Sequence, residues 1–159
     1  MDKINAVLNN YKFKECVSQN EKYEKNRIFC SHDLQHFLDV ARISYIMVLE
    51  NNINLSKEVV YGTALLHDIG RWMQYKDGIS HEIASYNLAK DILLECDYNE
   101  EEINIILSAI SSHRSKNCKE GTFNYTFYLS DKLSRNCFLC EASSKCNWCE
   151  KEKNRKIIY

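Results

Sequence analysis

The chain has 159 residues, which suits one domain and allows a hydrophobic core that needs neither a disulfide nor a metal ion for its stability. Its 21 Lys and Arg residues nearly balance its 22 Asp and Glu residues, so the overall charge favours neither nucleic acid nor an anionic membrane as a partner. The N-terminus has mixed charges without an apolar signal core, and no stretch reaches the roughly 20 apolar residues of a membrane span, so we expect a cytoplasmic protein that acts on a small molecule.

Proline is absent and glycine occurs only four times, which favours helices over a many-stranded sheet. Hydrophobic spacing predicts an all-α, single-domain bundle of about six to seven helices. In chain order we expect helices over about residues 4–11, 31–51, 56–70, 80–96, 99–113 and 124–134. The polar residues 18–27 are expected to be mostly a connection. Ser31 and Ser56 are expected to cap the starts of two helices, and Gly70 to end the second of these.

The C-terminal residues 137–159 differ from the rest of the chain because they are dense in Cys, Lys and Glu. We expect residues 1–136 to form the helical domain, with its core in residues 28–136, and the Cys-rich tail to pack on that same domain. The tail should be irregular apart from a short charged helix over about residues 150–156.

Five of the predicted helices each place a histidine or an aspartate on their apolar face. His36 continues a stripe with Val40, and His67 continues one with Ala64, at the three- and four-residue spacing of one helix face. A single inward histidine is usually a hydrogen-bonded core residue, but bundle cores also build metal sites from side chains that converge in this way. The inward residues are His32, His36, His67, His81, His113 and Asp131.

Three of these residues have an alternative interpretation. His113, in the last turn of its helix, could offset the negative end of the helix dipole. His81 could be a solvated residue at a helix start, and Asp131 could form a surface ion pair with Lys132, which would contribute little to stability. None of these alternatives explains the pair His67-Asp68.

The pair His67-Asp68 follows an apolar run at the predicted end of a helix. The last turn of a helix carries partial negative charge, so a carboxylate is unfavourable there. A buried anion in such a place needs a cation, and the neighbouring imidazole makes a metal ion the best candidate. The pair therefore predicts a metal site.

Three stretches carry a resemblance to a known family: His36-Phe-Leu-Asp-Val-Ala41, then Ala64-Leu-Leu-His67-Asp68-Ile-Gly70, then His81, His113 and Leu129-Ser-Asp131. Over about residues 28–136 the chain resembles the HD-domain superfamily of metal-dependent phosphohydrolases. The resemblance implies a helical bundle in which one metal ion is held by His36, His67, Asp68 and Asp131. It also implies a second ion held by His81 and His113, with Asp68 as the bridge.

The chemistry expected from these ligands is hydrolysis. Imidazole and carboxylate without thiolate suit Mn, Fe, Zn, Co or Ni, and two such ions would activate a water and stabilise an in-line displacement at phosphorus. We expect cleavage of a phosphate ester or anhydride in a small, nucleotide-like substrate, with catalysis carried by Asp68, His67 and Arg71. There are two alternatives. One is an HD-type di-iron oxygenase, whose ligand pattern resembles that of this chain. The other is a non-catalytic metal- or nucleotide-binding module.

Several basic residues are candidates for binding the substrate phosphate, although each could also serve only surface solubility. Arg71 stands where many members of the resembled family carry Lys, and Arg suits bidentate contact with phosphate. His32 is a weaker ligand candidate than His36 and could instead contact the substrate or support a ligand. The candidates are Arg27, His32, Arg71, Arg114 and Lys132.

The tail contains two C-x-x-C pairs separated by five residues: Cys137, Cys140, Cys146 and Cys149. Thiolates in such pairs suit a structural zinc ion, although the separation is short for a zinc ribbon. Free thiols, an iron–sulfur cluster and a redox disulfide are the alternatives. The other four cysteines are unpaired in sequence and are expected to be small core or surface residues, and Trp148 is expected to pack the tail on the bundle.

Overall fold

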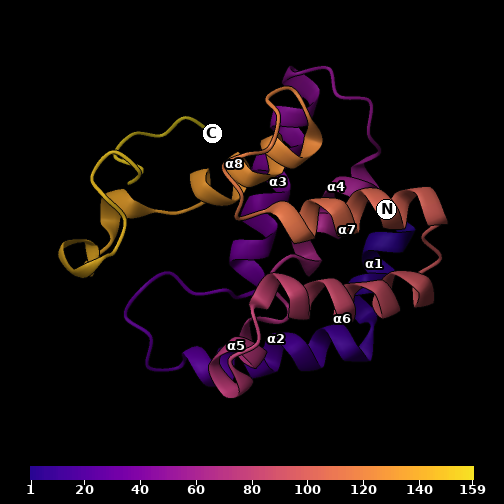
Figure 1. Ribbon diagram of the computed structural model, residues 1–159, viewed down its shortest axis with the longest axis horizontal. Coiled ribbons are helices and arrows are strands. Elements are labelled where there is room, and N and C mark those ends of the chain that lie inside the picture. Colours follow the sequence, from indigo (N-terminus) through magenta and orange to yellow (C-terminus); the bar gives the residue numbers. More distant parts are fainter.

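The computed structural model describes residues 1–159 and contains eight α-helices, two short 3-10 helices and no strand (Figure 1). The all-α fold predicted from the sequence is thereby confirmed. The α-helices are α1 (Asp2–Asn9), α2 (Tyr11–Glu24), α3 (Leu34–Glu50), α4 (Lys57–Leu66), α5 (Arg71–Asp77), α6 (His81–Glu95), α7 (Glu100–Ser112) and α8 (Phe123–Leu133). The 3-10 helices are η1 (Cys137–Leu139) and η2 (Ser143–Lys145).

Five of the eight α-helices start after a residue whose side chain caps them: α2, α3, α4, α7 and α8. Ser56 accepts a hydrogen bond from the Val59 amide, and Asn99 forms a capping box with Glu102 at the start of α7. The predicted cap Ser31 is wrong, because Asp33 caps α3 and accepts from the His36 amide at 2.9 Å. Ser31 instead donates its hydroxyl to Asp33.

Helix α2 includes residues 18–24, which the sequence pattern predicts to be part of a connection. The Asn10 side chain caps it, and Phe13, Cys16, Asn20 and Glu24 are buried along one face at helical spacing. The second half of that face is polar, so apolar periodicity does not indicate a helix there. The prediction of an irregular segment over residues 18–27 is therefore wrong for residues 18–24.

Gly70 does not end a helix. Helix α4 ends at Leu66, and Gly70 precedes the first residue of α5, a helix that was not predicted from the sequence. The role of Gly70 is steric, because a Cβ atom there would lie 2.5 Å from the Ser85 amide nitrogen and 2.6 Å from the Ala84 Cβ. Its absent side chain lets the α4–α5 turn contact the backbone of α6.

Helix α4 is the central element of the bundle. It packs against α3, α7 and α1, while α3 also packs against α8 and α6 against α7 (Figure 1). These contacts form a core of 26 buried residues. The C-terminal end of α4 consequently lies inside the molecule, surrounded by helices on several sides. No helix combines the length and the apolar character that a membrane crossing requires.

The tail lies beside α8 (Figure 1). The Asn154 amide donates to the carbonyl oxygens of Lys132 and Arg135, and the Lys132 ammonium lies 5.0 Å from the centre of the Trp148 ring, as expected if Trp148 packs the tail on the bundle. The helix predicted over residues 150–156 does not form. Lys153 and Arg155 instead donate to the carbonyl oxygens of earlier tail residues, which holds this segment in an irregular conformation.

Candidate metal centre

The turn between α4 and α5 places His67 and Asp68 in the centre of the bundle. His67 is the C-cap of α4, and Asp68 follows it before α5 begins. Both side chains are buried, with relative exposures of 0% and 3%. His67 Nδ1 donates to the carbonyl oxygen of Ala64 at 2.7 Å, which leaves Nε2 directed into the bundle.

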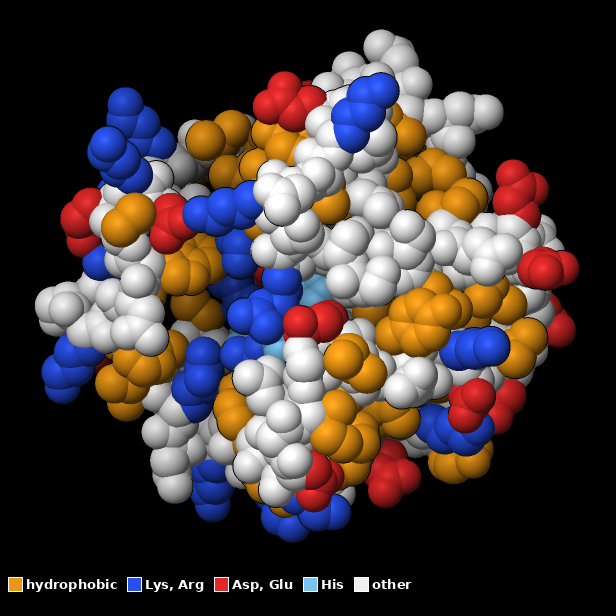
Figure 2. Space-filling model, in the orientation of Figure 1, with side chains coloured by type: hydrophobic (Ala, Val, Ile, Leu, Met, Phe, Trp, Pro, Cys, Tyr) orange, Lys and Arg blue, Asp and Glu red, His pale blue; other side chains and the backbone are white.

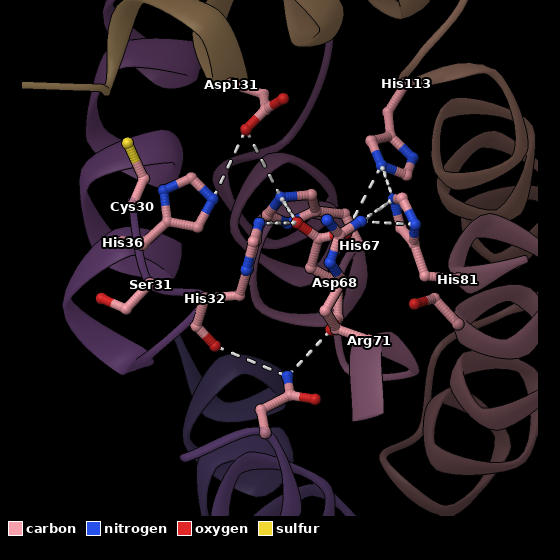
Figure 3. A network of polar contacts seen from close by, with 12 residues as sticks. Cys30, Ser31, His32, His36, His67, Asp68, Arg71, His81, His113 and Asp131 are labelled. Atoms are coloured by element: carbon pink, nitrogen blue, oxygen red, sulfur yellow. Dashed lines mark hydrogen bonds and ion pairs between the residues drawn. The ribbon is translucent and has the colours of Figure 1, made fainter. Parts of the chain in front are cut away.

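Two further side chains approach this pair from α3 and α8 (Figure 3). The ligand atoms of His36, His67 and Asp68 all lie within 4.8 Å of one another. Asp131 Oδ1 lies 3.4 Å from His36 Nε2 and 3.8 Å from His67 Nε2. We call these four residues the first group: His36, His67, Asp68 and Asp131.

Asp68 also belongs to a second group, formed with His81 and His113. Asp68 Oδ1 lies 3.2 Å from His81 Nε2 and 3.5 Å from His113 Nε2. His113 Nδ1 donates to the carbonyl oxygen of Ile110 at 2.6 Å, so its Nε2 is the free nitrogen, as in His67. The Asp68 carboxylate therefore lies between the two groups. All six residues predicted as ligands lie together in one cluster.

Two buried atoms of this cluster have no hydrogen-bond partner: His67 Nε2 and Asp68 Oδ1. An unsatisfied buried polar atom costs about 1–3 kcal/mol, and a cation beside both atoms would remove that cost. The donors are imidazole nitrogens and carboxylate oxygens without sulfur, which suits divalent first-row metals. The residues present therefore fit a divalent metal ion.

The buried groups of the cluster strongly influence one another's protonation. Burial lowers the pKa of His36 to about 4 and that of His81 to about 3. Burial also opposes the charged form of His67, but the adjacent Asp68 and Asp131 outweigh it and raise its pKa to about 10. Burial would raise the pKa values of the two carboxyl groups, yet the neighbouring imidazoles hold both well below the usual range. The carboxylates thus carry the negative charge that a cation requires.

Arg135 is a site residue that sequence reasoning missed. Its Nη2 atom lies 3.0 Å from His36 Nε2 and 3.4 Å from Asp131 Oδ1, and its Nη1 donates to the Ser31 carbonyl oxygen. Arg135 is one helical turn after Asp131, so the spacing of four residues was a usable signal. It places a buried positive charge next to the first group.

Glu24 is a second residue that was missed, because it lies on the part of α2 expected to be a connection. Its carboxylate accepts from His32 Nδ1 at 2.6 Å, from the His32 amide at 2.7 Å and from the Tyr75 hydroxyl at 2.6 Å. Burial would raise the pKa of Glu24, but the contacts with His32 outweigh it and lower the pKa to about 2. His32 Nε2 is thereby directed toward Asp68, at 3.7 Å from Oδ2.

Asn20 links α2 to the turn that carries the cluster. Its Nδ2 donates to the Asp68 carbonyl oxygen and its Oδ1 accepts from the Trp72 amide, both at 2.9 Å, and its side chain is fully buried. We expect Asn20→Ala to destabilise the fold by about 2 kcal/mol, because it leaves two backbone groups unsatisfied. Urea unfolding would measure this, with Asn9→Ala as a control: Asn9 is exposed at the end of α1, and its replacement is expected to change stability by less than about 0.5 kcal/mol. Equal stability of the two variants would contradict the bridging role.

A cavity of about 260 Å³ opens onto the cluster, and Asp68, His81, His113 and Asp131 form part of its wall. Figure 2 shows histidine at the bottom of a hollow that is surrounded by Lys and Arg side chains. All five residues predicted to contact phosphate lie in this wall. The cationic residues of the wall are Arg27, Arg71, Arg114, Lys132, Arg135 and Lys153.

The four tail cysteines are not gathered around one point. Only the histidine and aspartate groups bring three or more candidate ligand atoms within 4.8 Å of one another. Cys149 is exposed, whereas Cys137, Cys140 and Cys146 line the cavity. The predicted set of four tail ligands is therefore not assembled in this structure, because the second C-x-x-C pair directs its two thiols to different surroundings.

A helical bundle that gathers His, His-Asp, His, His and Asp in this order defines a class of metal-binding proteins. The chain matches the HD domain family over residues 33–142 and belongs to this family, as the sequence resemblance predicted. Proteins with this domain are in general metal-dependent phosphohydrolases that bind divalent ions. An uncharacterized protein of Clostridium beijerinckii is 46% identical over 159 residues, and the alignment covers all of both chains.

More distant relatives include Ribonuclease Y from two mycoplasmas. The enzymes of Mycoplasma mycoides and Mycoplasma capricolum are 30% and 29% identical to this chain over 101 residues. The alignments cover 64% of this chain but only 18% of either ribonuclease. No solved structure matches the chain.

Proposed function

We propose that this protein is a metal-dependent phosphohydrolase that cleaves a phosphate ester or anhydride bond in a small, nucleotide-like substrate. The observation that carries the proposal is the position of the two ligand groups at the bottom of a cavity whose wall holds six cationic side chains. The two ligand groups and the cationic wall face the same cavity, which suits a phosphoryl group that contacts both.

In this proposal the first group holds one ion and the second group holds another, with Asp68 shared. When bound, the two ions would lower the pKa of a water molecule and neutralise negative charge on the phosphoryl group. The carbonyl oxygens of Ala64 and Ile110 hold His67 and His113 in the orientation that presents Nε2 to the cluster. Glu24 keeps the proton of His32 on Nδ1 and so orients that ring at the cavity wall.

The charge of the wall supports hydrolysis over the oxygenase alternative. Six cationic side chains converge on a cavity in a chain whose net charge is −1, so the positive charge is local. Such a wall favours an anionic substrate, and Arg in particular binds phosphate through paired hydrogen bonds. A neutral substrate oxidised at a C–H bond would make no use of this positive charge.

A second candidate substrate is the end of a short RNA chain. The relatives named Ribonuclease Y suggest it, and a second cavity of about 610 Å³ supports it. This second cavity shares Arg114, Lys132, Trp148 and Lys153 with the first, and further Lys and Arg residues line it. The overall charge argued against nucleic acid, but a locally basic groove with an aromatic ring can bind a few linked nucleotides.

The test is a hydrolysis panel on purified full-length protein. The protein is stripped with a chelator, reloaded with Mn, Co, Ni, Fe or Zn, and assayed without oxygen against nucleoside monophosphates, dinucleoside polyphosphates, cyclic nucleotides and a short oligoribonucleotide. Nucleotide products are separated by chromatography and inorganic phosphate is measured alongside, because the last three substrates can be hydrolysed without release of inorganic phosphate. We expect metal-dependent hydrolysis of a mononucleotide-sized substrate and none by the chelated protein. Absence of hydrolysis with every metal and substrate would overturn the proposal, and cleavage of the oligoribonucleotide alone would favour the second candidate.

Arg71 provides a sharper test of the cavity wall. Its guanidinium is partly buried beside the second group, with Nη1 2.7 Å from His81 Nδ1. We expect Arg71→Met to lower kcat/KM by about 10- to 100-fold, since a charge-assisted hydrogen bond to phosphate contributes about 1.5–3 kcal/mol. Arg42→Met is the control, because Arg42 is exposed on α3 and pairs only with Asp39. Equal activity of both variants would exclude Arg71 from phosphate binding.

A further inference from the structure

Four cysteines line one wall of the active-site cavity: Cys30, Cys137, Cys140 and Cys146. Cys30 comes from the segment before α3, and the other three come from the tail, more than one hundred positions later in the chain. All four are free thiols, and none is fully exposed. Cys149, which the sequence grouped with the tail cysteines, is exposed and does not line this cavity.

Cys30 lines the same cavity as Cys137 and Cys140, the first C-x-x-C pair of the tail. Burial raises the pKa of the Cys30 thiol, and the charges of Cys137 and Cys140 raise it further, while Arg135 acts in the opposite direction. In Figure 3 the Cys30 sulfur points away from the imidazole of His36, so it is directed out of the histidine cluster.

We propose that Cys30, Cys137, Cys140 and Cys146 hold one metal centre with four thiolate ligands, in the wall of the active-site cavity. Four thiolates are the ligand set of a structural zinc ion and of an iron–sulfur cluster. The site is separate from the histidine and aspartate groups, which contain no sulfur. Cys30 thus takes the place that the sequence pattern assigned to Cys149.

The surroundings of these thiols suit deprotonated ligands. Arg27, Arg135 and Lys153 line the same wall and can offset the negative charge of four thiolates. Two of these also hold the segment of Cys30 in place, because Arg27 Nε donates to the Cys30 carbonyl oxygen at 2.9 Å and Arg135 Nη1 to the Ser31 carbonyl oxygen at 3.0 Å. The protein therefore supplies both the ligands and their counter-charges.

Metal binding would have to draw the two segments together. No three of the four sulfurs lie within 4.8 Å of one another, so metal binding would require residues 137–146 to move closer to Cys30. This movement would fix the segment that carries Arg27 and His32 against the tail. If the proposed phosphohydrolase function holds, the thiolate centre completes the cavity wall on the side of these two substrate-binding candidates.

Cobalt substitution tests the site without reference to activity. Full-length protein, purified without oxygen and stripped of metal, is titrated with Co²⁺ while the near-ultraviolet thiolate-to-cobalt charge-transfer absorption is recorded. The histidine and aspartate groups cannot produce this band. We expect Cys30→Ser to reduce the band and to weaken the Co²⁺ affinity of the site by at least about tenfold. Cys149→Ser is the matched control and is expected to leave both unchanged, with circular dichroism confirming that both variants fold.

The metal content of the protein as purified distinguishes the two centres. Zinc that is lost in Cys30→Ser but kept in Cys149→Ser indicates a zinc ion at the thiolates, whereas iron with acid-labile sulfide indicates a cluster, and either result supports the thiolate site. Three results would overturn it: no charge-transfer band with wild-type protein, loss of the band in Cys149→Ser but not in Cys30→Ser, or a disulfide between Cys30 and the tail in protein kept reduced. The cobalt experiment is read by absorption and not by activity. A negative result would therefore overturn the thiolate site without deciding whether the protein is a phosphohydrolase.

Discussion

Replacement of Asp68 by alanine is expected to abolish phosphate release and to lower the metal content at both ligand groups. Asp68 is the only residue that both groups share, with Oδ1 3.2 Å from His81 Nε2 and Oδ2 3.3 Å from His67 Nε2. We expect activity to fall by about 1000-fold or more, which corresponds to about 4 kcal/mol in the activation barrier. Metal analysis of the dialysed variant, together with the phosphate assay, measures both effects.

His113→Ala is the matched comparison for Asp68→Ala. His113 contacts only the second group, and its side chain is as deeply buried as that of Asp68. We expect this variant to lose mainly one of two metal equivalents, whereas Asp68→Ala should lose both. If Asp68→Ala keeps full activity and an unchanged metal content, the assignment of the shared carboxylate is wrong.

Asp68→Ala is also expected to change the stability of the metal-free, chelated protein. From the sequence, Asp68 at the end of a helix was expected to be unfavourable without a metal, so its removal would leave the fold unchanged or add up to about 1 kcal/mol. The structure argues for the opposite result. Asp68 has its carboxylate oxygens within 3.7 Å of four imidazole rings. It also precedes the N-terminal end of α5, where a carboxylate is favourable. We therefore expect chelated Asp68→Ala to be less stable than chelated wild type.

The ligand cluster could be predicted from the sequence because its residues follow helix periodicity. His36 and His113 lie on apolar faces with several hydrophobic neighbours, and this pattern depends only on local spacing. The HD domain match then confirmed the family whose order of histidines and aspartates the chain resembles. What remains a proposal is the number of metal ions and their identity, since the geometry of nitrogen and oxygen donors does not distinguish among first-row metals.

The supporting residues could not be predicted in the same way. Asn20 and Glu24 are buried polar residues whose partners are distant in the sequence, so they look like a solvated connection until the fold brings α2 against the α4–α5 turn. Cys30 has no cysteine near it in the sequence, and only the folded chain brings it to the wall that the tail cysteines share. Local pattern thus identified the candidate metal ligands, while long-range contacts determined their surroundings.

Among glycine-to-alanine substitutions in this chain, Gly70→Ala is expected to reduce the free energy of unfolding the most. The added Cβ would lie 2.5 Å from the Ser85 amide nitrogen and 2.7 Å from the Ala84 carbonyl carbon, which are backbone atoms that cannot rotate away. At Gly62 the nearest atom is the Tyr98 hydroxyl at 2.8 Å, and that side chain can move. We expect a loss of about 3 kcal/mol for Gly70→Ala, at the upper end for overpacking, and a smaller loss for Gly62→Ala.

The effect of Gly70→Ala should extend to the metal centre, because the contact that it breaks holds α6 against the α4–α5 turn. The Gly70 amide donates to Ser85 Oγ at 2.9 Å, one helical turn after His81, whose Nε2 lies 3.2 Å from Asp68. Pushing α6 outward would separate these two ligands, so metal should be lost from the second group before the first. Urea unfolding with chelator present measures the stability, and metal analysis measures the occupancy of the site.

Gly78→Ala is the control. No atom lies within 4 Å of the added Cβ there, but φ is +71°, so its cost of about 1–2 kcal/mol comes from backbone strain alone. This variant should leave the metal content unchanged. If the Gly70 and Gly78 variants lose equal stability and both keep their metal, close contact with α6 is not what requires glycine at position 70.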